Sequence, residues 1–196
     1  SPAQGQPDFV VVLVGPEGKS AVVDADGNVT PRAARILGAG GAVVGVDLFL
    51  TGELADAGVS AQRDHFKNYF TTHNRTDLQE RAQDIATVAA YARARHKGAK
   101  VALWASAGSA SWALLAAPAA DWQVVDAAGF DESDAAQLLD RANFVPGYRK
   151  LGGVATALTL AREGAFLVFN AKSSLNLAPA KAVFAAAGNS RNLDAR

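Results

Sequence analysis

Hydrophobic residues along the chain are concentrated in five short runs separated by segments of mixed polarity. The runs are rich in β-branched and aromatic residues and are too short for helices. Each therefore predicts a strand that is buried on both faces of a sheet. The predicted strands span residues 9–14, 42–48, 100–105, 122–127 and 165–170.

Segments with helical periodicity lie between these runs. Residues 77–95 place Leu78, Ile85 and Ala89 on one helical face, and Asp77 is the predicted N-terminal cap. Residues 31–41 begin with a proline and end in glycines, as helices often do. Further helices are predicted directly after Gly108 and within 152–164 and 177–188. This alternation predicts an α/β three-layer sandwich around a five-stranded, mostly parallel sheet with right-handed crossovers.

Composition narrows the class of protein. A chain of 196 residues is long enough for one well-buried domain, and its formal net charge of zero does not favour a nucleic-acid-binding or membrane-binding surface. Cysteine is absent, which excludes disulfides and thiolate chemistry. Methionine is absent too, so Ser1 is expected to be a processed or excised end. We expect residues 1–8 to form a linker or processed N-terminus and residues 9–196 to form a single domain.

The segment at residues 100–117 predicts a strand, a sharp turn and a helix, and Ser106 lies in the turn. With Gly108 two residues later, it resembles the nucleophile elbow G-x-S-x-G of hydrolases, although Trp104 stands in place of the first glycine. Ser106 is therefore a candidate catalytic nucleophile. Two other interpretations remain open: Ser106 is a helix N-cap, or the nucleophile position falls on Ala107.

A serine nucleophile needs a histidine base that is oriented by a carboxylate. In hydrolases with this elbow, the acid and then the histidine follow the serine in the chain. No histidine follows His96, so the usual triad cannot form, and His73 would serve only in an unusual geometry. The downstream candidates for the acid are Asp126, Asp131, Glu132 and Asp134, and the last predicted strand is followed by Asn170, Ser173 and Ser174.

Two other motifs favour turns over ligand sites. Residues 15–20, GPEGKS, lack the first glycine of a phosphate-binding loop, and residues 24–28, DADGN, carry their glycine at the wrong position for a calcium loop. We predict a hairpin turn at 24–28. His65, His73 and His96 do not have the spacing of metal ligands. No metal and no cofactor are expected.

Four segments together resemble the α/β-hydrolase fold, in particular acetyl xylan esterase-like proteins with a second, C-terminal hydrolase-like region. They are residues 43–54, 73–91, 103–117 and 142–153. The resemblance implies that the five strands match the third to seventh strands of a hydrolase sheet, in the order 2-1-3-4-5. It also implies a truncated hydrolase that lacks the last strand and its histidine.

Three functions follow as hypotheses. The first is an esterase-related, catalytically degenerate domain that acts as partner of a carbohydrate (acetyl xylan-type) esterase module upstream in the same protein. Such a protein would be secreted or periplasmic. The second is an active carboxylic-ester hydrolase of the acetyl esterase type that uses Ser106 and a histidine from outside the usual position. The third is a flavodoxin-like binder of a small anion at the point where the strand order reverses.

Overall fold

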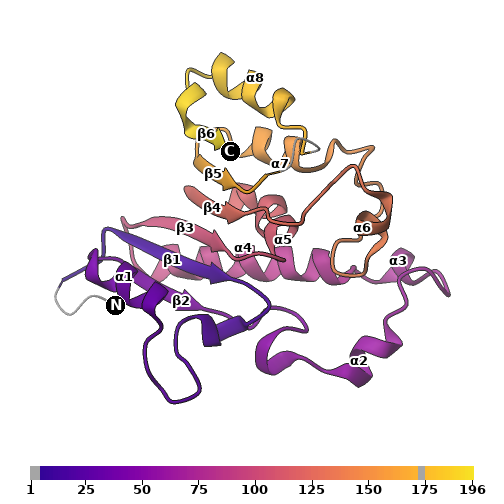
Figure 1. Ribbon diagram of the computed structural model, residues 1–196, viewed down its shortest axis with the longest axis horizontal. Coiled ribbons are helices and arrows are strands. Elements are labelled where there is room, and N and C mark those ends of the chain that lie inside the picture. The colour runs from indigo at the N-terminus through magenta and orange to yellow at the C-terminus, as the bar shows by residue number, and fades with distance from the viewer. Residues whose placement is uncertain (1–4, 172–174) are drawn as a thin grey trace.

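Six parallel strands form one sheet in the order β2-β1-β3-β4-β5-β6 (Figure 1). The computed structural model describes residues 5–171 and 175–196. The strands are β1 (Phe9–Val14), β2 (Ala42–Gly45), β3 (Lys100–Ala105), β4 (Trp122–Asp126), β5 (Ala165–Phe169) and β6 (Leu193–Ala195). The predicted α/β class and parallel order are confirmed. The predicted number of five strands is wrong, because β6 has only three residues and one of them is the exposed Asp194.

Eight α-helices connect the strands within the described residues. They are α1 (Pro31–Gly38), α2 (Ala57–Gln62), α3 (Phe70–His73), α4 (Asp77–Arg95), α5 (Ala110–Leu115), α6 (Ala135–Leu139), α7 (Gly153–Leu160) and α8 (Ala178–Ala186). Short 3-10 helices add η1 (Gly18–Ala21), η2 (Gly52–Leu54), η3 (Ala117–Ala119) and η4 (Ser190–Asn192). The long helix has the predicted bounds, but its cap is Thr76 and not Asp77. Thr76 and Gln79 form a reciprocal capping box, which leaves the Asp77 carboxylate free for other partners.

The helices cover the two faces of the sheet unequally. On one face, β1, β3, β4 and β5 pack against α4, α5, α7 and α8, where Ile85, Leu114, Leu158 and Phe184 are fully buried. On the other face, a small cluster joins Ile36 of α1 to Val11, Leu13 and Ala102. Figure 1 shows α1 beside β1 and β2, away from β4 and β5. The sequence pattern predicted burial on both faces, and β4 and β5 depart from it.

The turn at residues 24–28 is a hairpin turn, as predicted. Val23 and Val29 form an antiparallel bridge, and Gly27 has a φ of +83°. The Asp24 carboxylate accepts hydrogen bonds from the backbone N–H groups of Asp26 and Asn28. This carboxylate therefore stabilises the turn itself.

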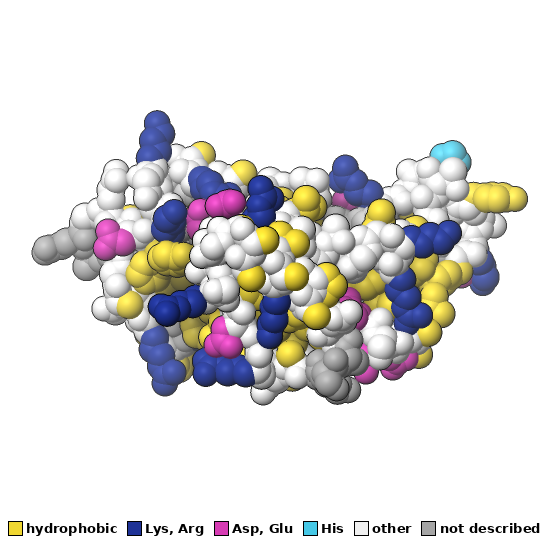
Figure 2. Space-filling model, turned by 90° about the horizontal axis from the view of Figure 1, so that it is seen from above, with side chains coloured by type: hydrophobic (Ala, Val, Ile, Leu, Met, Phe, Trp, Pro, Cys, Tyr) yellow, Lys and Arg dark blue, Asp and Glu magenta, His cyan; other side chains and the backbone are white. Residues whose placement is uncertain are grey.

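On the face shown in Figure 2, no large area of the surface carries charges of one sign only. There, basic and acidic side chains are interspersed, and hydrophobic side chains reach the surface between them (Figure 2). None of the helices in the described ranges has the length and the apolar character needed to cross a bilayer.

Candidate active site at the turn after β3

Ser106 follows the last residue of β3 and precedes α5, at the carboxyl end of the central part of the sheet. Its backbone N–H donates to the carbonyl oxygen of Val14 at 3.0 Å, which extends the pairing of β3 with β1 by one residue. The side-chain hydroxyl lies 3.3 Å from Oε2 of Glu17 and 3.5 Å from the Val14 carbonyl oxygen. The structure thus places Ser106 where sequence predicted it, but beside a carboxylate.

Ser109 stabilises the turn through its side chain. Its side chain is fully buried, and its hydroxyl lies 2.7 Å from the carbonyl oxygen of Ser106 and 3.0 Å from that of Val14. The N-cap position of α5 belongs to Ser109, not to Ser106, although its side chain makes no capping hydrogen bond. The N-cap interpretation of Ser106 is therefore wrong.

The backbone of the turn differs from a hydrolase elbow. In that motif the nucleophile sits on a strained turn that lifts its hydroxyl above the sheet. Here neither Ser106 nor Ala107 has a positive φ, and Gly108 takes the left-handed conformation with a φ of +85°. The turn is consequently relaxed, and its one unusual conformation is carried by a glycine at no steric cost.

The three histidines do not reach this turn. His73 ends α3 and is exposed, and His96 is the C-cap residue of α4. His65 is buried, and its Nε2 lies 3.1 Å from Oδ1 of Asp77. The rings of Phe70 and Phe144 lie 5.2 Å and 6.0 Å from its own ring. His65 is therefore held inside the loop connection between β2 and α4.

Asp77 is the centre of a buried charge cluster, which we define as Asp77, Arg63, His65 and Arg141. Oδ1 of Asp77 accepts from Nε of Arg63 at 2.7 Å, and Oδ2 accepts from Nε of Arg141 at 2.8 Å. Asp77 itself is only 2% exposed. The cluster fastens the connection between β2 and α4 to the start of α4 and to the segment after α6. From the sequence, Asp77 was predicted only as a helix cap. No local sequence pattern indicated its contacts with Arg63, His65 and Arg141.

Burial and charge act in opposite directions on the pKa values of this cluster. Burial lowers the pKa of His65 below its ordinary 6.5, and the hydrogen bond to Asp77 offsets only part of that effect. For Asp77, burial alone would raise the pKa, but the hydrogen bond from Arg63, the charge of Arg141 and the hydrogen bond from His65 outweigh it. The pKa of Asp77 is therefore lowered from 3.8.

These shifts predict loss of stability in acid. Unfolded His65 takes up a proton near pH 6.5, whereas the folded residue resists protonation, so the free energy of unfolding decreases as the pH falls below about 6.5. Below pH 3.8 the lowered pKa of Asp77 adds to the loss. Urea unfolding of the wild type and of His65→Gln at pH 7.5, 6.0 and 5.0 measures this. We expect the wild type to lose more stability than the variant across that range, and parallel losses would contradict the assignment.

The predicted acid candidates after Ser106 are engaged elsewhere. Asp126 accepts from Nδ2 of Asn170 at 2.9 Å, and Glu132 accepts from the Tyr148 hydroxyl at 3.0 Å. Asp134 caps α6, and Asp131 accepts from the backbone and hydroxyl of Ser133. Ser173 and Ser174 lie outside the described residues. None of these contacts orients a histidine toward Ser106.

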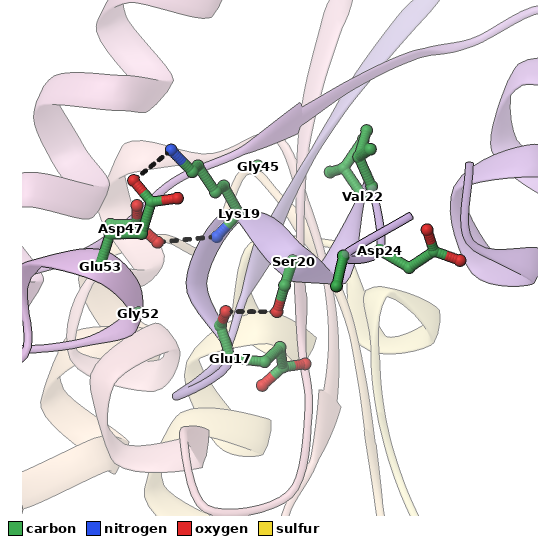
Figure 3. A pocket seen from close by; sticks show the side chains of 11 residues that line it. Glu17, Lys19, Ser20, Val22, Asp24, Gly45, Asp47, Gly52 and Glu53 are labelled. Carbon is green, nitrogen blue, oxygen red and sulfur yellow. Dashed lines mark hydrogen bonds and ion pairs between the residues drawn. The ribbon is translucent and has the colours of Figure 1, made fainter. Parts of the chain in front are cut away.

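A cavity of about 640 Å³ opens at the carboxyl ends of β1 and β2, beside Glu17 (Figure 3). Its walls include Lys19, Asp47 and Glu53, and Lys19 Nζ lies 2.5 Å from Oε2 of Glu53. That hydrogen bond is the main reason why the pKa of Lys19 is raised. Because the one lysine is already paired with a carboxylate, the cavity does not favour phosphate. This agrees with the interpretation of residues 15–20 as a turn.

Two glycines shape the wall of this cavity around Asp47. Gly18 and Gly52 have φ values of +61° and +52°, and a Cβ on either would lie 1.9 Å or 2.0 Å from Oδ1 of Asp47. The same oxygen accepts from the backbone N–H of Lys19 at 2.9 Å. Asp47 therefore ties the loop after β1 to the loop after β2. Within residues 5–171 and 175–196, we find no group of three or more His, Asp or Glu side chains placed to hold a metal ion.

Comparison with known proteins agrees with this architecture. No family model matches the sequence, and no curated protein matches it. Among solved structures, a candidate acetyl xylan esterase from Bacteroides fragilis NCTC 9343 superposes on 98% of this chain with a TM-score of 0.72 at 11% sequence identity. The chain has an α/β-hydrolase fold.

Two further α/β-hydrolase neighbours superpose less closely, with lower TM-scores. TT1662 from Thermus thermophilus matches 99% of this chain with a TM-score of 0.55 at 14% identity. A CE15 glucuronoyl esterase from Teredinibacter turnerae T7901 matches 94% with a TM-score of 0.55 at 15% identity. This chain spans 59% of the Bacteroides structure, 80% of TT1662 and 56% of the glucuronoyl esterase. At such identities the similarity shows the α/β-hydrolase fold and does not transfer an activity.

Proposed function

We propose that this α/β-hydrolase-like domain is catalytically inactive by itself and acts as a partner domain of a carbohydrate esterase of the acetyl xylan type. The proposed inactivity rests on the surroundings of the Ser106 hydroxyl. Its partners are a carboxylate of Glu17 and the carbonyl of Val14, and neither is an imidazole. A serine becomes a nucleophile only when a positioned base removes its proton in the transition state.

The position of Glu17 also opposes acyl transfer electrostatically. Hydrolases of this fold hold the developing oxyanion with N–H groups of the residue after the nucleophile and of the loop after the third strand. By the resemblance, β1 corresponds to that third strand, so the loop is residues 15–18. In this loop Pro16 has no N–H, the N–H of Gly18 donates to Gly15, and Glu17 places a carboxylate 3.3 Å from the Ser106 hydroxyl. A negative charge there would destabilise an oxyanion.

His65, which is buried, supports the same conclusion. The Nε2 of His65 is occupied by Asp77, and aromatic rings lie against the imidazole. Moving His65 toward Ser106 would break its hydrogen bond to Asp77 and take its ring away from Phe70 and Phe144. Losing a hydrogen bond at a buried group costs about 1–3 kcal/mol, so this rearrangement is disfavoured.

Hydrolysis of p-nitrophenyl acetate by the purified chain tests the inactivity. Wild type, Ser106→Ala and Ser190→Ala, which replaces an exposed serine in η4, are compared at equal concentration. We expect equal, background rates for all three proteins and no labelling of Ser106 by a fluorophosphonate that reacts with activated serines. A rate that decreases at least tenfold in Ser106→Ala alone would instead establish the second candidate, an active carboxylic-ester hydrolase. The position of Ser106 between β3 and α5, at the carboxyl end of the sheet, is the observation that favours that candidate.

The partner role rests on the retained fold and on the esterases among the structural neighbours. A domain that keeps the packing of a hydrolase without its base is suited to binding or orientation. Polymeric xylan is too large to cross a membrane, so a secreted or periplasmic location belongs to the same proposal.

The partner role is tested by the coding region upstream of Ser1, where we expect an esterase module. Deletion of this domain from the whole polypeptide should lower kcat/KM on acetyl xylan and leave p-nitrophenyl acetate hydrolysis unchanged. An upstream region without an esterase module would overturn the partner role.

A further inference from the structure

A single buried side chain anchors the long connection between β2 and α4. We define the strap as residues 52–75 of this connection, which contain η2, α2 and α3. Within the strap only His65 is buried, at 5% exposure, and neither α2 nor α3 contributes a buried residue. Figure 1 shows α2 and α3 at one end of the molecule, away from α1 and α8. A segment with so few buried contacts opens at a lower free energy than the core beside it.

Charged groups from each segment packed against the His65 ring surround it. They are Arg63 and Asp64 of the strap, Arg141 after α6, and Asp77 of α4, on which Arg81 of the same helix also acts. The Asp64 carboxylate is already paired, since it lies 3.2 Å from Nζ of Lys67. Asp77 carries one negative charge for the two guanidinium groups of Arg63 and Arg141. The charge beside the neutral ring is therefore net positive, and a proton on His65 would add to it.

The second ring nitrogen of His65 has no acceptor for a proton. Because Nε2 lies 3.1 Å from a carboxylate oxygen of Asp77, the neutral ring carries its hydrogen on Nε2 and leaves Nδ1 bare. Nδ1 is buried, and it has no hydrogen-bond partner among the described residues. Nη2 of Arg141 is buried without such a partner as well. A proton on Nδ1 would thus create a charged, unpaired N–H group in the protein interior, which is strongly unfavourable.

The backbone of the strap is strained close to this anchor. Asn68 and Tyr69 are consecutive and have φ values of +52° and +55°. This left-handed conformation is unfavourable for residues that carry a Cβ. The Tyr69 side chain is 84% exposed, so packing of its ring does not compensate for the strain. Attachment of the strap imposes this conformation, and release of the strap allows both residues to leave it.

We propose that acid releases the strap from the rest of the protein through protonation of His65. In the attached form, Nε2 of His65 donates to Asp77, and the ring centres of His65 and Phe66 lie 6.0 Å and 4.6 Å from that of Phe144. After release, the imidazole reaches water, where both of its N–H groups find acceptors, and Phe144 loses these two rings. The sheet and α4 stay folded, because their core contains no strap residue.

The size of the response follows from the difference between the two forms of His65. In the released strap its pKa is near 6.5, whereas burial lowers the pKa in the attached strap. Attachment is therefore fully favoured above pH 6.5 and is lost progressively as the pH falls below it. While the attached form stays neutral, each pH unit below 6.5 raises the ratio of released to attached strap about tenfold. From pH 7.5 to pH 5.5 we expect an increase of about tenfold.

Hydrogen exchange of the full chain, followed by mass spectrometry at pH 7.5, 6.5 and 5.5, tests the proposal. The rates are corrected for the intrinsic pH dependence of amide exchange. The backbone N–H groups of Arg63, Phe70 and Asn74 are hydrogen-bonded within the strap and report its release. We expect their protection to decrease about tenfold from pH 7.5 to pH 5.5 and to be at least about 100-fold below that of β3 at each pH. Strap amides that exchange no faster than those of β3 would overturn the proposal, because the strap would then open only when the whole chain unfolds.

His65→Gln keeps an N–H donor for Asp77 but takes up no proton, so its strap protection should change less than about twofold over this pH range. His73→Gln is the matched control, because His73 is exposed in the same strap, and it should respond to pH as the wild type does. A pH response that persists in His65→Gln would contradict the role of this residue. Should His65→Gln not fold, an NMR titration of the wild-type imidazoles decides: strap protection must decrease with the titration of His65, and a decrease that follows His73 or His96 would overturn the proposal.

Discussion

Asp77→Asn is expected to lower the free energy of unfolding by about 3–5 kcal/mol. The carboxylate of Asp77 is buried and accepts hydrogen bonds from Arg63 and Arg141, and it contacts His65. Asparagine is neutral, and its amide nitrogen would face donors where Asp77 offers an acceptor. The two arginines, which are only partly exposed, would remain beside this position without a counter-charge, and that is the costly way to break a buried ion pair. Urea unfolding at pH 7.5 measures the change.

The matched control for this substitution is Asp26→Asn in the exposed hairpin turn. The same chemical change there should leave the urea midpoint unchanged, because Asp26 is solvated. Limited trypsin digestion adds a local readout, since Arg63 and Lys67 lie in the connection that the buried charge cluster fastens. We expect Asp77→Asn to be cleaved there at least ten times faster than wild type. Equal cleavage rates and equal midpoints would show that the cluster does not hold this connection.

The parts of the fold that the sequence predicted are those set by local pattern. The bounds of α4 follow from a long amphipathic repeat with a cap, and β1, β3 and the carboxyl-end turn follow from apolar runs bounded by glycine. The short helices α2 and α3 have too few residues for a periodic signal. Likewise β6, with three residues, cannot be distinguished from a loop by pattern alone.

The sequence predicted the location of the candidate site but not the groups that contact Ser106. Ser106 lies in the predicted turn, and the absence of a downstream histidine was visible in the sequence. Its contact with Glu17 joins residues 89 positions apart and was missed. One signal could have found it: Glu17 and Ser106 each follow a strand, and the predicted order makes those strands neighbours. Parallel neighbours bring their carboxyl ends to the same edge, so the loops after them meet.

The buried charge cluster could not be predicted from pattern because its members come from three separate segments. Arg63 and His65 lie in a connection without periodicity, Asp77 begins a helix, and Arg141 follows another. Each residue alone resembles an ordinary solvated side chain. Only tertiary packing brings these residues together. Contacts between residues far apart in the sequence leave no local pattern that would reveal them.

Trp112→Ala is expected to lower the free energy of unfolding by about 3–5 kcal/mol, the range for removing a large aromatic from a core. Trp112 is 4% exposed on α5, directly behind the turn that holds Ser106. Its indole N–H donates to the carbonyl of Ala142 at 3.1 Å, and the guanidinium of Arg81 lies 4.3 Å from its ring. Alanine would remove the packing, the hydrogen bond and the cation–π contact together.

Two further variants separate these contributions in the same urea experiment. Trp112→Phe keeps an aromatic ring beside Arg81 but loses the N–H, and we expect a loss of about 1–3 kcal/mol because the Ala142 carbonyl is left unpaired. Tyr91→Ala removes an aromatic that is 60% exposed on α4 and should have little effect. If Trp112→Ala were as mild as Tyr91→Ala, α5 would not depend on this contact. The hydrolase-like segment from Trp104 to Ala117 would then owe its sequence to something other than packing behind the turn.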